Sequence, residues 1–218
     1  MSDFTGGFPK IDGLGMKKYG GAPFLQDLFA GTNGTHLESH TPNIGGAWTQ
    51  INFGLSMLEA DLNGSGKVVA QLQTLQATAG YINAAVPPTN DYKAYFTMTV
   101  GDLAHTDDCY VFIRAGANPN TSSYNFGFAV VAAKWQLRSG TTVLASSAVT
   151  LVQGNIRKIE CRAVGTTISG WVDGVQVLSV TDAAVAGPGK VAIYLGGSSV
   201  TSGGFTGYGA TDLYGIKI

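Results

Sequence analysis

The sequence predicts an all-β domain in which two antiparallel sheets pack face to face. The chain has 218 residues, 31 of them glycine. Short runs rich in β-branched and aromatic residues alternate with Gly, Asn, Asp and Pro, and turn signals recur about every 8–12 residues, as in sandwiches and barrels. No long stretch carries the 3.6-residue period of an amphipathic helix. A sandwich of roughly 200–250 residues is commonly one domain.

The strands are expected from the alternation of apolar and polar residues and from the turn residues between them. The predicted strands are Trp48–Phe53, Leu55–Glu59, Lys67–Leu72, Asp91–Val100, Cys109–Ala115, Phe126–Ala133, Lys134–Arg138, Thr141–Ser146, Ile156–Val164, Thr167–Val172, Val175–Val180, Lys190–Leu195 and Leu213–Ile218.

Local turn chemistry fixes several connections. The clearest is a hairpin at Asp173-Gly174, because Asp-Gly between two alternating runs is the strongest short-range hairpin signal. Further turns are predicted at Ser139-Gly140 and Val164-Gly165. The best candidate for a helix is a single turn at Ala183–Ala186.

Residues 1–24 differ from the rest of the chain. Gly-Gly pairs and prolines separate single hydrophobic residues, and neither a period of 2 nor one of 3.6 is present. We predict an extended N-terminal arm over 1–24, followed by one sandwich domain over 25–218. The arm is too apolar for a plain linker, so it needs a surface to lie on, either the domain's own or a partner's. The side chains expected to contact that surface are Phe4, Phe8, Ile11, Leu14, Met16 and Tyr19.

The charge content limits the partners of this chain. Charged residues make up 12% and the formal net charge is −1, against about 25% charged residues in ordinary domains. A surface poor in charge suits contact with other subunits or with uncharged glycans. Lys and Arg are scattered, so we expect no nucleic-acid partner. We also expect no membrane partner, because no apolar run reaches the roughly 20 residues of a transmembrane helix.

The N-terminus, MSDFTGG, lacks the basic start and apolar segment of a secretory signal. We therefore expect synthesis in a cytoplasm. The two cysteines, Cys109 and Cys161, lie among alternating apolar residues and are expected to be buried thiols that act as small hydrophobic groups. A disulfide would require the two strands to be neighbours.

Two segments resemble a known family. Residues 27–49, DLFAGTNGTHLESHTPNIGGAWT, resemble the opening of concanavalin-A-like and laminin-G-like jelly rolls of phage and bacterial surface proteins. Residues 155–182, with a Gly-Thr turn and an Asp-Gly hairpin, resemble the second half of such domains. The resemblance covers roughly 25–218 and implies a concanavalin-A-like jelly-roll sandwich. It does not imply one function, because this sandwich hosts lectins, glycosidases, adhesive modules and virion parts.

The resemblance also implies a structural calcium ion where the first and last strands meet. The matching residues are Asp27 and Asp212, and carbonyl oxygens of residues 31–34 would complete the six or more oxygen ligands that calcium takes. The alternative is that the two aspartates cap turns.

Catalysis is not expected. Glycoside hydrolysis needs two carboxylates roughly 5–10 Å apart, and the chain has only three glutamates, Glu38, Glu59 and Glu160. The related glycosidases carry Glu-x-Asp-x-x-Glu, whereas the nearest string here, residues 59–64, ends in Gly64. No Gly-x-Ser-x-Gly nucleophile motif is present.

Glycan binding fits the composition best among the small-ligand functions. Two loops, Asn118–Asn125 and Gly196–Gly209, combine aromatic, amide and hydroxyl side chains. An aromatic ring in such a loop either stacks on a sugar or folds back on the sandwich. The candidate glycan-binding residues are Tyr124, Asn125, Phe205 and Tyr208.

Two functions follow from these observations. The first is an accessory structural protein of a bacteriophage virion, a capsid decoration or tail component, anchored by its arm to other virion proteins within a large assembly or oligomer. The alternative is a carbohydrate-binding adhesion module for cell-surface glycans. A glycoside hydrolase is a distant third.

Overall fold

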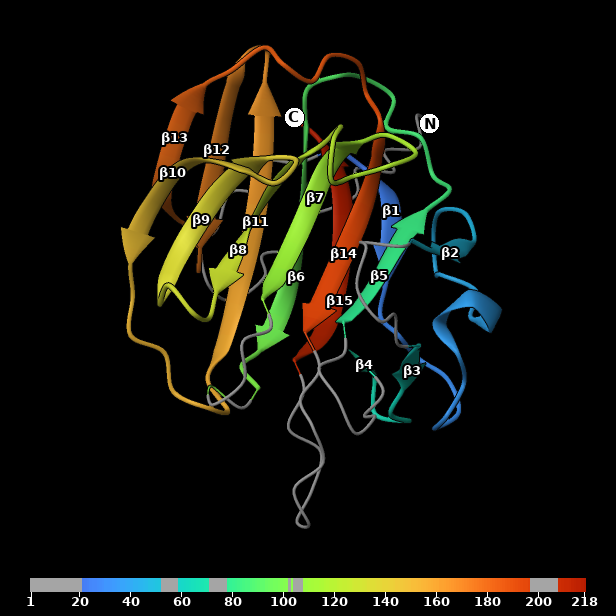
Figure 1. Cartoon of the computed structure of the whole chain (residues 1–218). Coiled ribbons are helices and arrows are strands. Elements are labelled where there is room, and N and C mark those ends of the chain that lie inside the picture. Colours follow the sequence, from blue (N-terminus) through green and yellow to red (C-terminus); the bar gives the residue numbers. More distant parts are fainter. Residues whose placement is uncertain (1–20, 52–58, 71–77, 102, 104–107, 197–207) are drawn as a thin grey trace, which may run out of the picture.

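The computed structural model describes residues 21–51, 59–70, 78–101, 103, 108–196 and 208–218. These residues form fifteen strands and one 3₁₀ helix, and they confirm the predicted sandwich of two antiparallel sheets (Figure 1). The elements are β1 (Pro23–Asp27), η1 (Leu37–Ser39), β2 (Trp48–Gln50), β3 (Ala60–Leu62), β4 (Val68–Ala70), β5 (Thr78–Asn83), β6 (Tyr92–Thr99), β7 (Cys109–Ala115), β8 (Tyr124–Ala129), β9 (Lys134–Ser139), β10 (Thr142–Ala148), β11 (Ile156–Val164), β12 (Thr167–Val172), β13 (Val175–Thr181), β14 (Lys190–Gly196) and β15 (Gly209–Lys217).

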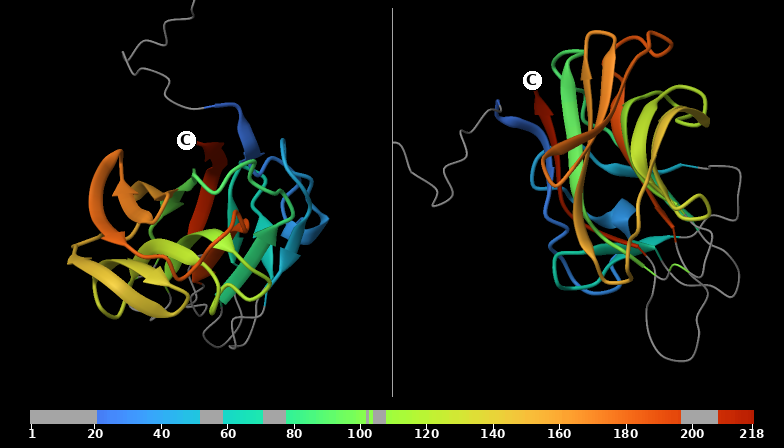
Figure 2. Two further views of the ribbon diagram at one scale, coloured as in Figure 1. Left: turned by 90° about the horizontal axis from the view of Figure 1, so that it is seen from above. Right: turned by 90° about the vertical axis from the view of Figure 1, so that its left-hand side faces the viewer.

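The two sheets form the two layers of the sandwich, as Figure 2 shows. The eight-stranded sheet has the order β13-β12-β11-β6-β15-β4-β3, and β1 pairs with the C-terminal part of β15. The seven-stranded sheet, in front in Figure 1, has the order β10-β9-β8-β7-β14-β5-β2. Neighbouring strands such as β7 and β14 are far apart in sequence. Between them the chain passes to the other sheet and returns. This is the predicted jelly roll.

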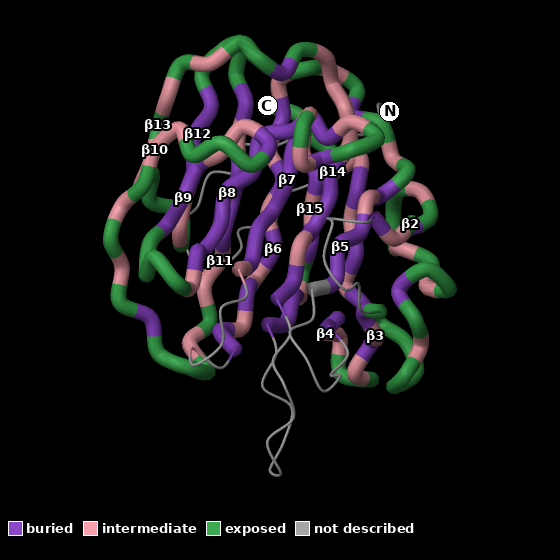
Figure 3. The backbone as a smooth tube through the Cα atoms, viewed as in Figure 1, coloured by how far each residue is buried: buried purple, intermediate pink, exposed green. Residues whose placement is uncertain are grey.

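The core lies between the sheets and contains most of the large apolar side chains (Figure 3). One row crosses the seven-stranded sheet through Ile193, Val111, Phe126 and Leu137, which pair successively. The alternation of apolar residues in the strands agrees with this core, because the following side chains are all buried: Phe96, Met98, Val100, Val111, Ile113, Phe126 and Phe128.

The two layers approach closely at β8 and β12. A Cβ atom on Gly170 would lie 2.2 Å from a ring carbon of Phe126. The ring of Phe126 also stacks on Trp135, with 5.8 Å between centroids. Because no larger side chain fits at position 170, the glycine lets the Phe126 ring reach the opposite sheet.

The predicted hairpin at Asp173-Gly174 is confirmed. Both residues have positive φ, 50° and 82°, as a type I′ turn requires. The helical turn predicted at 183–186 is wrong, because those residues form an irregular loop. The backbone N–H of Ala184 donates instead to the Asp182 carboxylate, 2.9 Å away, and such local side-chain bonds compete with helix formation.

Other strand predictions differ from the structure in length or presence. The strands β1, β3 and β5 lie outside the predicted set, and β2 ends at Gln50 rather than at residue 53. The predicted strand at 55–59 lies, except for Glu59, outside the described residues.

Both cysteines are buried, free thiols, as predicted. Cys109 lies in β7 and Cys161 in β11, which belong to opposite sheets, so they cannot be cross-strand neighbours. Burial raises the pKa of both thiols well above the ordinary value.

The segment that follows β1 is held by the carboxylate of Asp27, which is fully buried. Its Oδ1 accepts the backbone N–H of Phe29 at 2.8 Å and lies 2.8 Å from His40 Nε2. Its Oδ2 accepts the indole N–H of Trp48, also at 2.8 Å. One carboxylate therefore joins β1 to the loop after η1 and to β2 in the other sheet.

A second contact closes the loop before η1. His36 Nδ1 lies 2.7 Å from Asp61 Oδ1 and 3.2 Å from Glu59 Oε2. The hydrogen bond to Asp61 and the charges of Asp61 and Glu59 raise the pKa of His36 above 6.5. The pair connects the loop to β3 at the edge of the eight-stranded sheet.

We expect Asp27→Asn to lower the free energy of unfolding by about 1–3 kcal/mol, because an amide offers only one acceptor oxygen to the buried donors. Chemical denaturation in urea measures this change. Asp212→Asn is the matched control, since Asp212 is exposed and surface changes of this kind usually stay within about 0.5 kcal/mol. Equal losses in the two variants, seen only with calcium present, would show instead that the two carboxylates share a metal ion.

We expect the His36 contact to make stability depend on pH. A pKa raised on folding stabilises the protein fully below the unfolded pKa, and this contribution disappears as pH rises through the folded pKa. His36→Gln should therefore lose more stability at about pH 6 than at about pH 8, as measured by urea denaturation of both proteins at each pH. An equal loss at the two pH values would contradict the role of the charged imidazole.

Candidate functional site

The predicted site residues differ in their burial and in whether the structure describes them. Tyr124 faces the core and is fully buried, and its hydroxyl contacts Asp182 and the backbone N–H of Val185. It therefore offers no exposed ring to a sugar. Tyr208 is also buried, at 2% exposure, and packs in the main core. Phe205 lies outside the described residues, as do the arm residues Phe4, Phe8, Ile11, Leu14, Met16 and Tyr19.

The two aspartates of the predicted calcium site lie in different environments. Asp27 and Asp212 come from the paired strands β1 and β15, where Asp27 is opposite Leu213. Three N–H groups already surround the Asp27 carboxylate, whereas Asp212 is exposed. No group of three or more His, Cys, Asp or Glu residues suited to a metal occurs in the described part of the chain. The arrangement does not fit a calcium site centred on Asp27, and the site stays a prediction.

Asn125 lies in a different place from its neighbour Tyr124. It projects from the outer face of the seven-stranded sheet into a hollow of about 180 Å³. We call this site the aromatic hollow. It crosses the adjacent strands β9, β8, β7 and β14, and its lining residues are Asp108, Tyr110, Phe112, Asn120, Asn125, Arg138, Gly140, Thr141 and Tyr194.

Strand register places these side chains together. Phe112 pairs with Asn125 and Asn125 pairs with Arg138, so the three form one row across β7, β8 and β9. In the next row Tyr194 pairs with Tyr110, and Tyr110 pairs with Gly127. Since side chains alternate between the faces of a strand, both rows point away from the core.

Three aromatic rings lie at the base of the aromatic hollow, where Tyr110 and Phe112 are 2% and 4% exposed and Tyr194 is half-buried. The ring of Tyr110 is 6.3 Å from that of Phe112 at an angle of 70°, and 6.3 Å from that of Tyr194 at 55°. Gly127 leaves the space in which the Tyr110 ring lies, because a Cβ atom there would be 2.7 Å from Tyr110 Cδ1. The guanidinium carbon of Arg138 lies 4.4 Å from the centroid of the Tyr110 ring, a cation–π contact.

A polar network borders these rings. Arg138 Nη2 lies 3.3 Å from Asp108 Oδ2, and Nε donates to Gln136 Oε1 at 2.8 Å. The hydroxyl of Tyr110 donates toward Asp108 Oδ2, 3.0 Å away. Burial and the Asp108 charge raise the pKa of Tyr110, so its hydroxyl stays protonated. The network joins one cation to one carboxylate.

Asn125 is the unusual group in the aromatic hollow. Its side chain is 1% exposed, and its Nδ2 donates to the carbonyl of Gly140 at 2.8 Å. Its Oδ1 has no hydrogen-bond partner among the residues that the structure describes. A buried acceptor without a donor is costly and rare in native proteins.

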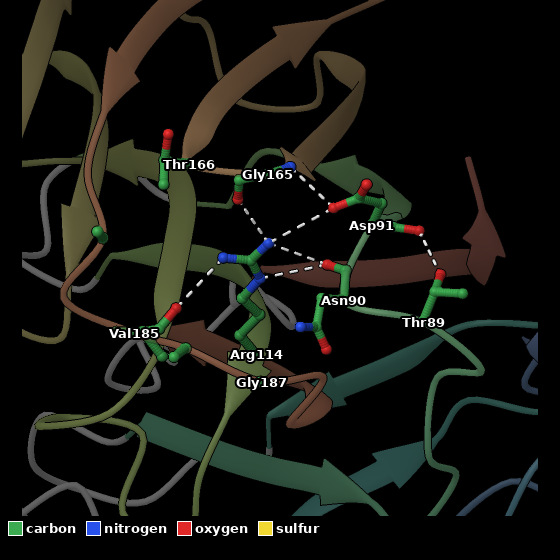
Figure 4. Close-up of a pocket in the computed structure, with 10 residues that line it drawn as sticks. Thr89, Asn90, Asp91, Arg114, Gly165, Thr166, Val185 and Gly187 are labelled. Atoms are coloured by element: carbon green, nitrogen blue, oxygen red, sulfur yellow. Dashed lines mark hydrogen bonds and ion pairs between the residues drawn. The ribbon is translucent and has the colours of Figure 1, made fainter.

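A second, larger pocket of about 620 Å³ opens at one end of the sandwich. Figure 4 shows Arg114 at this pocket, with its guanidinium among the backbone oxygens of Asn90, Gly165 and Val185. Arg114 has a φ of 51° and is 5% exposed. The residues that line this pocket include no aromatic ring. We interpret Arg114 as a structural residue whose hydrogen bonds connect three loops. The aromatic hollow is therefore the better candidate site.

Of the residues that line the aromatic hollow, Asn125 belongs to the predicted set, whereas Asp108, Tyr110, Phe112, Arg138 and Tyr194 do not. Their signal is present in the strand composition. In CYVFIRA, residues 109–115, one alternating set is apolar and the other contains Tyr110 and Phe112 before Arg114, and the structure buries every residue of β7. A strand with two apolar faces indicates that its second face is covered or bears a site.

Comparisons with known proteins support the fold. No family model and no curated protein matches the sequence, and no described helix is long and apolar enough to cross a membrane. Among solved structures, carbohydrate-binding module CBM66 from Bacillus subtilis is 12% identical with a TM-score of 0.57, over 79% of this chain and 97% of that one. A Bacillus licheniformis β-glucanase is 12% identical with a TM-score of 0.59, over 86% and 99%. Lectin II from Ulex europaeus is 9% identical with a TM-score of 0.57, over 89% and 99%. The chain thus has the jelly-roll fold of lectins and carbohydrate-binding modules.

Proposed function

We propose that this protein binds carbohydrate through the aromatic hollow. The observation that carries the proposal is the meeting of the half-buried ring of Tyr194 with the polar side chains of Asp108, Asn120 and Arg138 in one depression, above the buried rings of Tyr110 and Phe112. Ligand sites in proteins typically combine an apolar or aromatic lining with a few polar groups that fix orientation. Sugars present both kinds of surface, because C–H groups cover the ring faces and hydroxyls extend from the edge.

The charge of the aromatic hollow favours a neutral sugar. Arg138 and Asp108 are its charged lining residues, and they pair with each other. An anionic ligand would have to compete with Asp108 for the guanidinium, whereas a hydroxyl accepts or donates without disturbing the pair. The low content of charged residues in the whole chain, 12%, agrees with an uncharged partner.

Binding is favoured over hydrolysis. Cleavage of a glycosidic bond requires two carboxyl groups on either side of that bond. Asp108 is the one carboxylate in the lining of the aromatic hollow, and it is held by Arg138 and Tyr110. Glu59 and Asp61 contact His36 at β3 instead.

The solved structures of similar fold include a carbohydrate-binding module and a lectin, which agrees with this proposal at the level of fold. Nothing in the comparisons indicates a virion protein. The role in a bacteriophage particle stays a prediction from the sequence, and the arm on which it depends lies outside the described residues.

We expect Tyr194→Ala to weaken binding to neutral oligosaccharides about tenfold, since an aromatic contact contributes about 0.5–1.5 kcal/mol beyond its buried area. Glycan-array screening with gluco-, manno-, galacto- and fructo-oligosaccharides, followed by calorimetric titration of the best ligand, measures the change. Trp171→Ala is the matched control, because Trp171 is a half-buried aromatic of the other sheet, in contact with Arg162. No binding by the unaltered protein, or equal losses in both variants, would contradict the proposal.

A further inference from the structure

We infer that the outer face of the eight-stranded sheet binds an anionic polysaccharide, one that carries carboxylate or sulfate groups, through a cluster of cations on β6 and β11. We call this cluster the cationic face, and its side chains are Lys93, Tyr95, Lys158, Glu160 and Arg162. The aromatic hollow belongs to the other sheet. The inference therefore goes beyond the proposed function and does not depend on it.

Strand pairing gathers cations that are scattered along the sequence. Residues 158, 160 and 162 of β11 alternate with core residues, so their side chains point away from the core. On the neighbouring strand β6, Lys93 is paired with Arg162. Tyr95 is paired with Glu160. Three cations and one carboxylate therefore share a small area of one sheet face.

The carboxylate of Glu160 does not neutralise this area. Glu160 is 4% exposed, its Oε2 lies 3.2 Å from Lys93 Nζ, and its Oε1 accepts the Nε–H of Arg162. Among the residues that the structure describes, the Lys158 ammonium forms no ion pair with a carboxylate. Because the formal net charge of the whole chain is −1, attraction for an anion has to come from this local excess of positive charge.

Aromatic rings hold two of the cations in place. Lys158 Nζ lies 3.5 Å from the centroid of the Tyr95 ring, which itself stacks on Tyr214 with 5.1 Å between centroids. The guanidinium carbon of Arg162 lies 3.7 Å from the ring centroid of Trp171. A cation that is already fixed loses less side-chain entropy when an anion binds, so the rings preorganise the cationic face.

The excess charge is unfavourable in the free protein. Burial lowers the pKa of the Lys158 ammonium, and the charges of Lys93 and Arg162 lower it further, against the opposing effect of Glu160. A bound anion would act in the opposite direction, because a nearby opposite charge favours the charged form.

The cations are accessible from solvent, unlike the carboxylate between them. The side chains of Arg162 and Lys93 are 28% and 16% exposed, and Lys158 is half-buried. An anionic group of a ligand can therefore reach the cations without displacing Glu160 from its partners.

Other polyanions fit this face less well than a polysaccharide. Single-stranded nucleic acids bind by stacking bases on aromatic rings, but cations already lie on the rings of Tyr95 and Trp171. An acidic peptide cannot add as a strand, because β6 and β11 are interior strands that are paired on both sides. A polysaccharide needs charge and hydrogen-bonding partners for its hydroxyls. The exposed side chains of Gln176 and Ser179, on β13 of the same sheet, supply such partners.

Binding of the full chain to immobilised polygalacturonate and to immobilised heparin, at about 0.01 M salt, tests the inference. We expect Lys158→Gln to weaken binding about fivefold, as the loss of one exposed charge contact would. Lys134→Gln is the matched control, because Lys134 is an exposed lysine of β9 in the other sheet and the change in net charge is the same. No binding of either polysaccharide by the unaltered protein, or equal losses in the two variants, would overturn the inference.

Two further measurements need no altered protein, so they remain decisive if Lys158→Gln fails to fold. Affinity should fall about tenfold or more between about 0.01 and 1 M salt, because the screening length shortens from about 30 to 3 Å. An affinity independent of salt would contradict recognition through charge. Poly-glutamate and single-stranded DNA should compete less effectively than the free polysaccharide. Equal or stronger competition by either polymer would assign the cationic face to that class of ligand and overturn the polysaccharide.

Discussion

The contact between Phe126 and Gly170 across the two sheets fixes which face of β8 is turned to the core. The ring of Phe126 enters the space that Gly170 leaves open. Tyr124, Phe126 and Phe128 then point inward, and Asn125 and Gly127 point outward. A slip of one residue would exchange the two faces and place the amide in the core. The aromatic hollow thus depends on the packing of the core beneath it.

The outer face of the central strands is unlike an ordinary solvated sheet face. Tyr110 and Phe112 are 2% and 4% exposed although they point away from the main core, and they belong to a separate apolar cluster with Ala192 and Ile51. This second cluster stabilises the sheet from outside, and the network of Asp108, Gln136 and Arg138 satisfies most of its polar groups. Asn125 Oδ1 is the exception.

Much of the fold could be predicted from local signals. The bounds of β7, β11 and β12 agree with the predicted strands because Gly, Asn or Asp flanks each strong apolar run. The strands β1, β3 and β5 could not be predicted in this way, because their pairing with β15, β4 and β14 is set by tertiary contacts. For the site, the predicted loop at 118–125 includes two residues of the aromatic hollow, Asn120 and Asn125, whereas side-chain alternation along β8 turns Tyr124 into the core. Arg138 and Tyr194 come from strands distant in sequence, and only the fold brings them to one depression.

The geometry also bears on how the two functional hypotheses relate. The described chain begins beside β15, where Gly21 approaches Lys217, and β1 belongs to the eight-stranded sheet (Figure 2). The aromatic hollow lies on the outer face of the other sheet. Gly21 and Ala22 therefore lie on the side of the sandwich away from the aromatic hollow. A partner that contacted only these two residues would leave the aromatic hollow uncovered.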